Sequence, residues 1–461
     1  MLDLRDYCRQ DAVGLAALIR SRQVSADEAE DAARRAVAAV NDDLNALTRP
    51  LFEPAQGYQP DGPLAGVPFL VKDSGPFARG VPFTLGSRGI RGAVTGLDHE
   101  LMARFRAAGL AAIGQTTTPE MSFSFATESA MYGVTRSPWD LTRGVGGSSG
   151  GSAALVAAGA VPVAHGSDGA GSVRVPASCC GLVGLKPARG RTPGGYAGPG
   201  ESVAVDFALT RTVRDAAHLL DVVAHGTPGS RGYADQLRAP AEPLRVAVTT
   251  AAWSGVPIDA QVAAATVAVA AMLDWIGHRV VETSPTIDSD LVVEGEMLAV
   301  YAAGTALLGA PRQPDRALLE GVTRAVLRET LARTDADLAG AVRAQRQLSA
   351  SIAQFFSGHD VLVTPTIGRL PARHGTLDYD NASYSVRGWL RRIFEYGPFT
   401  APFNLSGHPA ISLPLGMSRE GLPIGVQLVA AAGREDVLIR LAAQLEQAMP
   451  WAAHQPSIFA G

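Results

Sequence analysis

The stretch Gly146-Gly147-Ser148-Ser149-Gly150-Gly151-Ser152 occurs once in the chain and lies between a strand pattern and a helix pattern. Glycines at such a junction let the backbone approach a bound molecule and adopt dihedral angles that other residues avoid. A flexible linker is the plainer interpretation, but the run is short and lies between two regular elements. Nucleotide loops fit poorly, because no lysine follows the glycines and a G-x-G-x-x-G pattern is matched only to its second glycine.

A second serine, Ser172, follows Ser148 by 24 positions. It ends the run Gly169-Ala170-Gly171-Ser172, whose successive backbone N–H groups can form a nest that binds an oxyanion. A serine among small residues is usually a turn residue. Beside such donors, however, it has what acyl transfer requires of a nucleophile. We therefore expect Gly169, Ala170, Gly171 and Ser172 to supply an oxyanion hole through their backbone.

A serine hydroxyl needs a base, and the candidate is Lys72, which ends the apolar run 67–71. A lysine can accept a proton when burial lowers its pKa. The alternative, a lysine whose tip reaches solvent or pairs with a carboxylate, stays open on this residue alone. His165 lies seven positions before Ser172 and is interpreted as a structural side chain.

Composition limits the classes of function. The 461 residues are 47% hydrophobic, carry a net charge of −4 and contain no basic tract, so a nucleic-acid partner has little support. The three cysteines, Cys8, Cys179 and Cys180, cannot form a disulfide framework. No metal site is expected, because the nine histidines are scattered. The N-terminus does not resemble a signal peptide and no long uncharged apolar run is present, so we expect a cytoplasmic protein without a membrane partner.

Strand and helix patterns alternate along the chain, which predicts an α/β fold with a sheet covered by helices on both faces. Expected strands lie at 67–71, 110–114, 161–165, 244–248, 361–363 and 424–429. Expected helices lie at 11–48, 97–108, 152–159, 211–226 and 435–448, with further helices through 258–356.

Together these segments resemble the amidase signature family, because the glycine and serine run, the 24-residue interval and the upstream lysine agree at once. The resemblance is dense over 62–215 and looser over 355–448. It implies an amidase-signature fold with a large mixed sheet, in one domain over 1–461. The expected parts are N-terminal helices at 1–60, the signature core at 62–215, a variable, mostly helical part at 216–356, and the C-terminal part of the core at 357–461.

The resemblance also implies a function, the hydrolysis of a small-molecule carboxylic amide without a metal or an organic cofactor (EC 3.5.1-like). Under it Ser172 is the acylated nucleophile, Ser148 the bridging serine after a cis peptide bond, and Lys72 the base. Ser149, Asp168 and Arg174 support the loops by hydrogen bonds. The substrate pocket is expected to draw on residues 120–135, with Met121 and Ser122 as binding candidates, and on helices within 285–400.

Two positions depart from the family pattern. Ala170 stands where glycine is usual, and its methyl group could restrict a positive φ or narrow the nest. Thr117 stands where asparagine is usual. We expect activity to survive both departures. The run 396–400, Tyr-Gly-Pro-Phe-Thr, is similar to hydrolases of cyclic amides and points to small cyclic or linear amides as substrates.

Two other functions share these residues. One is the glutaminase subunit of a tRNA-dependent amidotransferase, which works only in a complex. The other is an inactive family member that serves as a binding module, an interpretation that only Ala170 favours. The oligomeric state stays open, and a homodimer is possible because dimers are common among related enzymes.

Overall fold

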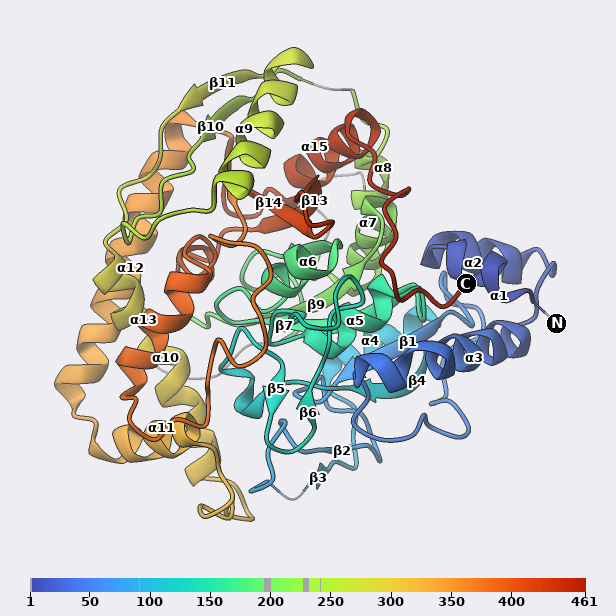
Figure 1. Cartoon of the computed structure of the whole chain (residues 1–461), viewed down its shortest axis with the longest axis horizontal. Helices are drawn as coiled ribbons and strands as arrows, with labels where there is room; N and C mark the ends of the chain where they lie inside the picture. Colours follow the sequence, from blue (N-terminus) through green and yellow to red (C-terminus); the bar gives the residue numbers. More distant parts are fainter. Residues whose placement is uncertain (1, 91, 195–199, 227–231, 241) are drawn as a thin grey trace.

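The computed structural model describes residues 2–90, 92–194, 200–226, 232–240 and 242–461. Within these residues, ten strands form one central mixed sheet, so the predicted α/β fold is confirmed (Figure 1). In spatial order the strands are β11 (Arg279–Glu282), β10 (Arg245–Val248), β12 (Val361–Pro365), β14 (Pro423–Ala430), β13 (Ala410–Met417), β8 (Val183–Lys186), β9 (Val205–Thr210), β7 (Val163–Asp168), β1 (Pro68–Lys72) and β4 (Ala111–Thr116).

The two ends of the sheet are parallel and its middle is antiparallel. β1 pairs in parallel with β4 and β7, and β10 pairs in parallel with β11 and β12. β9, β8, β13 and β14 join these ends through antiparallel pairs. Strands from early and late parts of the chain therefore lie next to each other. Two short hairpins lie outside the sheet, β2 (Pro82–Phe83) with β3 (Ala93–Val94), and β5 (Glu128–Ser129) with β6 (Gly133–Val134).

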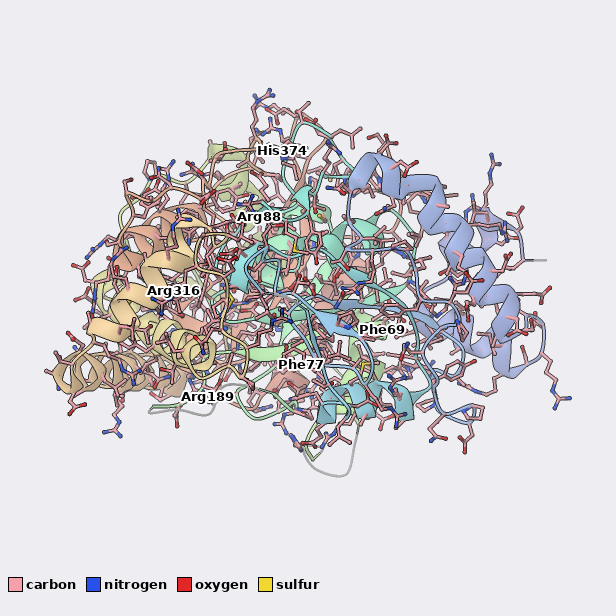
Figure 2. The ribbon with its side chains drawn as sticks, turned by 90° about the horizontal axis from the view of Figure 1, so that it is seen from below. Phe69, Phe77, Arg88, Arg189, Arg316 and His374 are labelled. Carbon is pink, nitrogen blue, oxygen red and sulfur yellow. The ribbon has the colours of Figure 1, made fainter. Side chains whose placement is uncertain are left out.

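Helices surround the sheet and gather into groups. Figure 1 shows α10 to α13 on one side of the molecule and α1 to α3 on the other, and Figure 2 shows the same separation from below. The helices are α1 (Leu4–Arg9), α2 (Ala12–Arg20), α3 (Ala26–Leu44), α4 (Glu100–Ala108), the 3-10 helix η1 (Glu120–Ser122), α5 (Gly150–Ala157), α6 (Arg174–Cys180), α7 (Val213–Val223), α8 (Tyr233–Gln236), α9 (Ala260–Trp275), α10 (Ser289–Leu308), α11 (Gly321–Ala332), α12 (Asp335–Gly358), α13 (Val386–Tyr396), α14 (Pro402–Leu405) and α15 (Glu435–Ala448).

The strand that carries Lys72 is buried on both faces, as its continuous apolar sequence requires. Phe69 packs against Phe105 of α4, with ring centroids 4.8 Å apart. Side chains alternate along a strand. Lys72, three residues further on and the last residue of β1, therefore points to the opposite face, where α5 packs against the strand.

The structure corrects several predicted element boundaries. Residues 11–48 do not form one helix: α2 ends at Arg20, and α3 begins after the N-cap residue Ser25, which forms a capping box with Glu28. The second helix ends at Leu44 because Asn45 adopts the left-handed conformation (φ 51°). The expected helix 152–159 begins two residues earlier, inside the glycine run. No strand was predicted at β8, β9, β11 or β13, and no helix at α6.

Among the described residues, α10 is the one helix with the length and apolar composition of a membrane span. Two-thirds of that apolar window (67%) is buried inside the protein, and the acidic residue Glu296 lies in its middle. These properties are those of a core helix.

Packing between β1 and α4 holds the strand of Lys72 in place, so removal of the Phe105 ring should destabilise the fold. Phe105 is completely buried, and we expect Phe105→Ala to lower the free energy of unfolding by about 3–5 kcal/mol. Urea titration followed by tryptophan fluorescence measures the change. Phe77, which is 37% exposed, is the control, and Phe77→Ala should cost less than about 1.5 kcal/mol. Equal losses in the two variants would contradict this account of the packing.

Candidate active site

Lys72 is completely buried and its ammonium nitrogen contacts two hydroxyl groups. Its Nζ atom lies 2.7 Å from the Oγ atom of Ser148 and 2.8 Å from the Oγ atom of Ser167. Burial lowers the pKa of Lys72 to about 7, although the charges of Asp206 and Asp168 act in the opposite direction. A substantial fraction of this amine is therefore neutral near pH 7, the form that can accept a proton.

Ser148 is held by its backbone as well as by Lys72. The Gly147–Ser148 peptide bond is cis, as the family resemblance implied. The carbonyl of Ser148 accepts a hydrogen bond from the Thr118 hydroxyl at 3.0 Å. A side chain at position 147 would place its Cβ atom 2.7 Å from the carbonyl oxygen of Ser124, so this close approach requires glycine.

The two serine loops are joined through backbone and side-chain contacts. The Ser149 N–H donates to the carbonyl of Ser172 at 3.2 Å, and the Ser149 hydroxyl donates to the carbonyl of Ser167 at 3.2 Å. Ser172 is 6% exposed. Its hydroxyl has no hydrogen-bond partner among the described residues, Ser148 included. The Ser172 hydroxyl is thus available to a bound molecule.

The segment 169–172 presents free donors. None of the backbone N–H groups of Gly169, Ala170, Gly171 and Ser172 has an acceptor within the described part of the chain, as a site for an external anion requires. Thr400 shapes this segment by donating from its hydroxyl to the Ala170 carbonyl at 2.6 Å. A Cβ atom at Gly171, whose φ is 140°, would lie 2.4 Å from the Thr400 hydroxyl oxygen.

Ala170 does not restrict the nest in the way its sequence position suggested. Its φ is not positive, whereas that of Gly171 is. The position that requires glycine is therefore 171, where glycine is present. The other departure from the family pattern, Thr117, is buried, and within the described residues its side chain makes no hydrogen bond to Ser148 or Ser172. Its hydroxyl lies 2.7 Å from that of Thr135 and 3.3 Å from the carbonyl of Ala46.

A buried ion pair lies behind the nest. Arg174 and Asp168 are both completely buried and make a bidentate contact, with Nε–Oδ2 at 3.0 Å and Nη2–Oδ1 at 2.9 Å. Burial alone would raise the pKa of Asp168, but the Arg174 guanidinium outweighs it and lowers that pKa to about 2. The remaining Arg174 donors reach Thr400 O at 2.9 Å, Gln427 Oε1 at 2.7 Å and Asn404 Oδ1.

Met121 and Ser122 form a turn next to the serine loops. Both have φ values in the left-handed region, 56° and 59°. The Ser122 hydroxyl lies 3.0 Å from that of Thr118, which in turn bonds to the Ser148 carbonyl. The turn is therefore two hydrogen bonds away from Ser148, and a substrate contact there stays a prediction.

Sequence reasoning gave no role to several residues that the structure brings to this site. These residues are Thr118, Ser167, Thr400, Asn404 and Gln427. Each lies within 62–215 or 355–448, the two ranges that resemble the family. This location was the only feature of the sequence that could have indicated a role for these residues. His165 and Cys180 are buried structural side chains: His165 contacts Asp206 at 3.2 Å, and burial keeps the pKa of the Cys180 thiol raised.

Comparison with known proteins extends this description. A family model named Amidase matches residues 17–439. The chain belongs to the amidase signature family. Its members hydrolyse C–N bonds of carboxylic amides, and this amidase is a hydrolase of that class. In the described residues of this amidase, no three histidine, cysteine, aspartate or glutamate side chains come together as metal ligands.

Relatives of this amidase cover nearly its whole length. It is 40% identical to a 6-aminohexanoate-cyclic-dimer hydrolase of Pseudomonas sp., with 97% of each chain covered. A putative amidase, AmiB2, of Mycobacterium tuberculosis is 39% identical over 86% of this chain and 84% of its own. The structure of a 6-aminohexanoate cyclic dimer hydrolase complexed with its substrate superposes with a TM-score of 0.87 at 38% identity, covering 98% of this chain and 99% of the other.

The Arg174 guanidinium can be tested by substitution with lysine. A lysine has no planar set of donors and cannot reach Asp168, Thr400, Gln427 and Asn404 together. We expect Arg174→Lys to lower the free energy of unfolding by about 3–5 kcal/mol, because buried polar partners are left unpaired. Differential scanning calorimetry and urea titration measure the loss. The control is Arg434→Lys at a half-exposed ion pair with Asp436, which should cost less than about 1 kcal/mol. A lysine variant as stable as the parent would contradict the role given to the ion pair.

Proposed function

We propose that this amidase hydrolyses a small, uncharged cyclic or linear amide through an acyl-serine at Ser172, with Lys72 as the base acting through Ser148. The proposal rests on the arrangement of Lys72, Ser148 and the loop 169–172. A buried amine whose pKa is about 7 contacts the Ser148 hydroxyl, while a neighbouring loop presents a serine hydroxyl and four N–H groups that have no partner among the described residues.

The acylation half-reaction follows from these groups. Neutral Lys72 accepts the proton of Ser148, and Ser148 accepts the proton of Ser172 once that hydroxyl turns toward it. The Ser172 Oγ atom attacks the amide carbon, and the negative charge on the carbonyl oxygen is held by the N–H groups of 169–172. Loss of one donor of this kind typically reduces the rate about 10²–10³-fold.

Cleavage of the C–N bond completes acylation, and hydrolysis of the acyl-serine then returns the enzyme to its starting state. When the C–N bond breaks, the departing nitrogen takes the proton from Lys72 by way of Ser148. Water then gives up a proton along the same path and attacks the acyl-serine. The C–O bond to Ser172 breaks, the carboxylic acid leaves, and Ser172 regains its proton.

The substrate class rests on relatives and on one segment. Two relatives at 40% identity are named for a cyclic dimer of 6-aminohexanoate, and the run 396–400 is similar to hydrolases of cyclic amides. Phe399 in this run is fully buried beside Trp253, with ring centroids 5.6 Å apart, and the next residue is Thr400 of the nest. A neutral cyclic or linear amide is therefore the class to test first.

A panel of amides tests the function. We expect the purified chain to hydrolyse the cyclic dimer of 6-aminohexanoate or a linear uncharged amide, and Ser172→Ala to reduce kcat at least about 10³-fold. Released amine or ammonia is measured over cyclic amides, primary amides, anilides and glutamine. Unchanged turnover in Ser172→Ala would exclude this nucleophile. Turnover of glutamine alone, and only with added partner subunits, would favour the amidotransferase subunit instead. No turnover and no labelling by a fluorophosphonate would favour a binding module.

The pH dependence of the rate tests Lys72. The base must be neutral, and its pKa is about 7, so kcat/KM should rise about tenfold per pH unit below pH 7 and level off above it. Lys186 provides a control, because it is also buried and burial lowers its pKa to about 7 as well. Lys186→Met should keep the inflection, and Lys72→Met should lose activity at every pH. A profile that falls with rising pH, or an inflection that disappears in Lys186→Met, would contradict the assignment.

A further inference from the structure

Glu120 is a completely buried acidic residue directly before the turn of Met121 and Ser122. The two turn residues have φ values of 56° and 59°. Residues other than glycine adopt this left-handed region at a cost in free energy. Two in succession persist only where the surrounding contacts impose them, so the neighbours of the turn determine its shape.

The Glu120 carboxylate supplies the contacts that bind this turn to its surroundings. Its Oε1 atom accepts a hydrogen bond from the backbone N–H of Glu320 at 2.9 Å, and its Oε2 atom accepts one from the Ser87 hydroxyl at 2.8 Å. The Met121 N–H adds a bond to the carbonyl of Leu85 at 2.8 Å. One side chain therefore joins the turn, the loop 85–90 and the start of α11.

The start of α11 is itself fixed from other directions. Glu320 is the N-cap residue of this helix, and its own carboxylate accepts from the Ala130 N–H of the β5–β6 hairpin at 2.9 Å. The next N–H, that of Gly321, donates to Asp380 at 2.8 Å. The loop 85–90 runs beside the same region, with the backbone N–H of Asp315 donating to the carbonyl of Gly89; Figure 2 labels Arg88 in this loop.

An apolar contact accompanies these hydrogen bonds. A small cluster of buried leucines from α10, α11 and the residue before Glu320 lies apart from the main core, and Met121 packs against it. Its members are Leu307, Leu319 and Leu327, with Ile90, Met121 and Leu308 at its margin. Met121 therefore connects the variable helices with the segment next to the serine loops.

A buried carboxylate at position 120 lowers the stability of the fold. Within the described residues, neither Glu120 nor Glu320 has a cationic ion-pair partner, and burial raises the pKa of both, that of Glu320 to about 7. The charged groups that face Glu320 are Glu120, Asp380 and Arg88. Buried acids without an ion-pair partner reduce stability. The hydrogen bonds described above give Glu120 a role that offsets this cost, because they join the turn to α11.

We propose that Glu120 is a positioning residue for substrate selection. It fastens the Met121–Ser122 turn to α11, and this turn, whose Ser122 hydroxyl bonds to Thr118 next to Ser148, forms a wall for the methylene-rich part of the amide. This inference rests on the proposed function. Within the described residues the Glu120 side chain bonds to none of Lys72, Ser148 and Ser172, so we expect its loss to change substrate binding more than proton transfer.

Steady-state kinetics of Glu120→Ala provide the test. For a methylene-rich amide turned over by the parent enzyme, we expect KM to rise at least tenfold while kcat stays within threefold. A short primary amide such as acetamide should show less than a threefold change in KM. Glu120→Gln keeps an acceptor for the Glu320 N–H and can donate to Ser87, so its KM should return to within threefold of the parent. Ser87→Ala, which removes one partner of the Glu120 carboxylate and leaves Glu320 and Thr323 in place, should raise KM less than Glu120→Ala does.

A matched control separates positioning from general stability. The Glu329 carboxylate accepts from the Val386 N–H at the start of α13, at 2.9 Å, in the same helical region, and within the described residues it makes no bond to residues 120–122. Glu329→Ala should lower the melting temperature by a similar amount without changing KM.

Three results would overturn the inference: equal KM changes in the Glu120 and Glu329 variants, a loss confined to kcat, or an unchanged KM in both Glu120→Ala and Ser87→Ala. If Glu120→Ala fails to fold, the comparison of Ser87→Ala with Glu329→Ala decides. Turnover by Ser172→Ala would instead refute the proposed function, whatever the Glu120 variants do.

Discussion

The completely buried ion pair of Arg174 and Asp168 is the interaction on which the rest of the site depends. Arg174 begins α6 and Asp168 ends β7, so the pair closes the loop that carries Ser172. The remaining guanidinium donors bond to groups from 400–427, which belong to the C-terminal part of the chain. Two charges in a dry interior are stable only when every donor and acceptor finds a partner. The C-terminal strands and α14 are thus needed to complete a loop encoded far earlier in the sequence.

Burial has different consequences for the two interior lysines. It lowers the pKa of both to about 7. Lys72 faces two serine hydroxyls, which can exchange protons with it, whereas Lys186 bonds to the carbonyl of Pro187, which cannot. The pKa alone therefore does not distinguish a base from a structural cation. The hydrogen-bond partners favour Lys72 over Lys186 as the base, and these partners depend on which loops the sheet order brings to each strand end.

The sequence was informative where structure is local. The apolar run before Lys72, the glycine run and the strand–helix alternation predicted β1, α5 and the sheet, because each leaves a short pattern. By contrast, α6 contains Pro176 and β13 contains Pro414, so neither has an uninterrupted pattern. Among the candidate site residues, Lys72, Ser148 and Ser172 were singled out from their motif positions, while Ser167, Asn404 and Gln427 were not. Their roles arise from contacts between segments up to 253 positions apart, which no local pattern records.

The position of α10 to α13 has an evolutionary consequence. Figure 1 places these helices to one side of the strands that carry Lys72 and the serine loops. The sheet and its loops can therefore stay constant while insertions, deletions and substitutions accumulate in the helices. A lineage could acquire a new range of amide substrates by changes in α10 to α13, while the residues of the candidate active site are inherited unchanged. Selection on the two parts would then run at different rates within one gene.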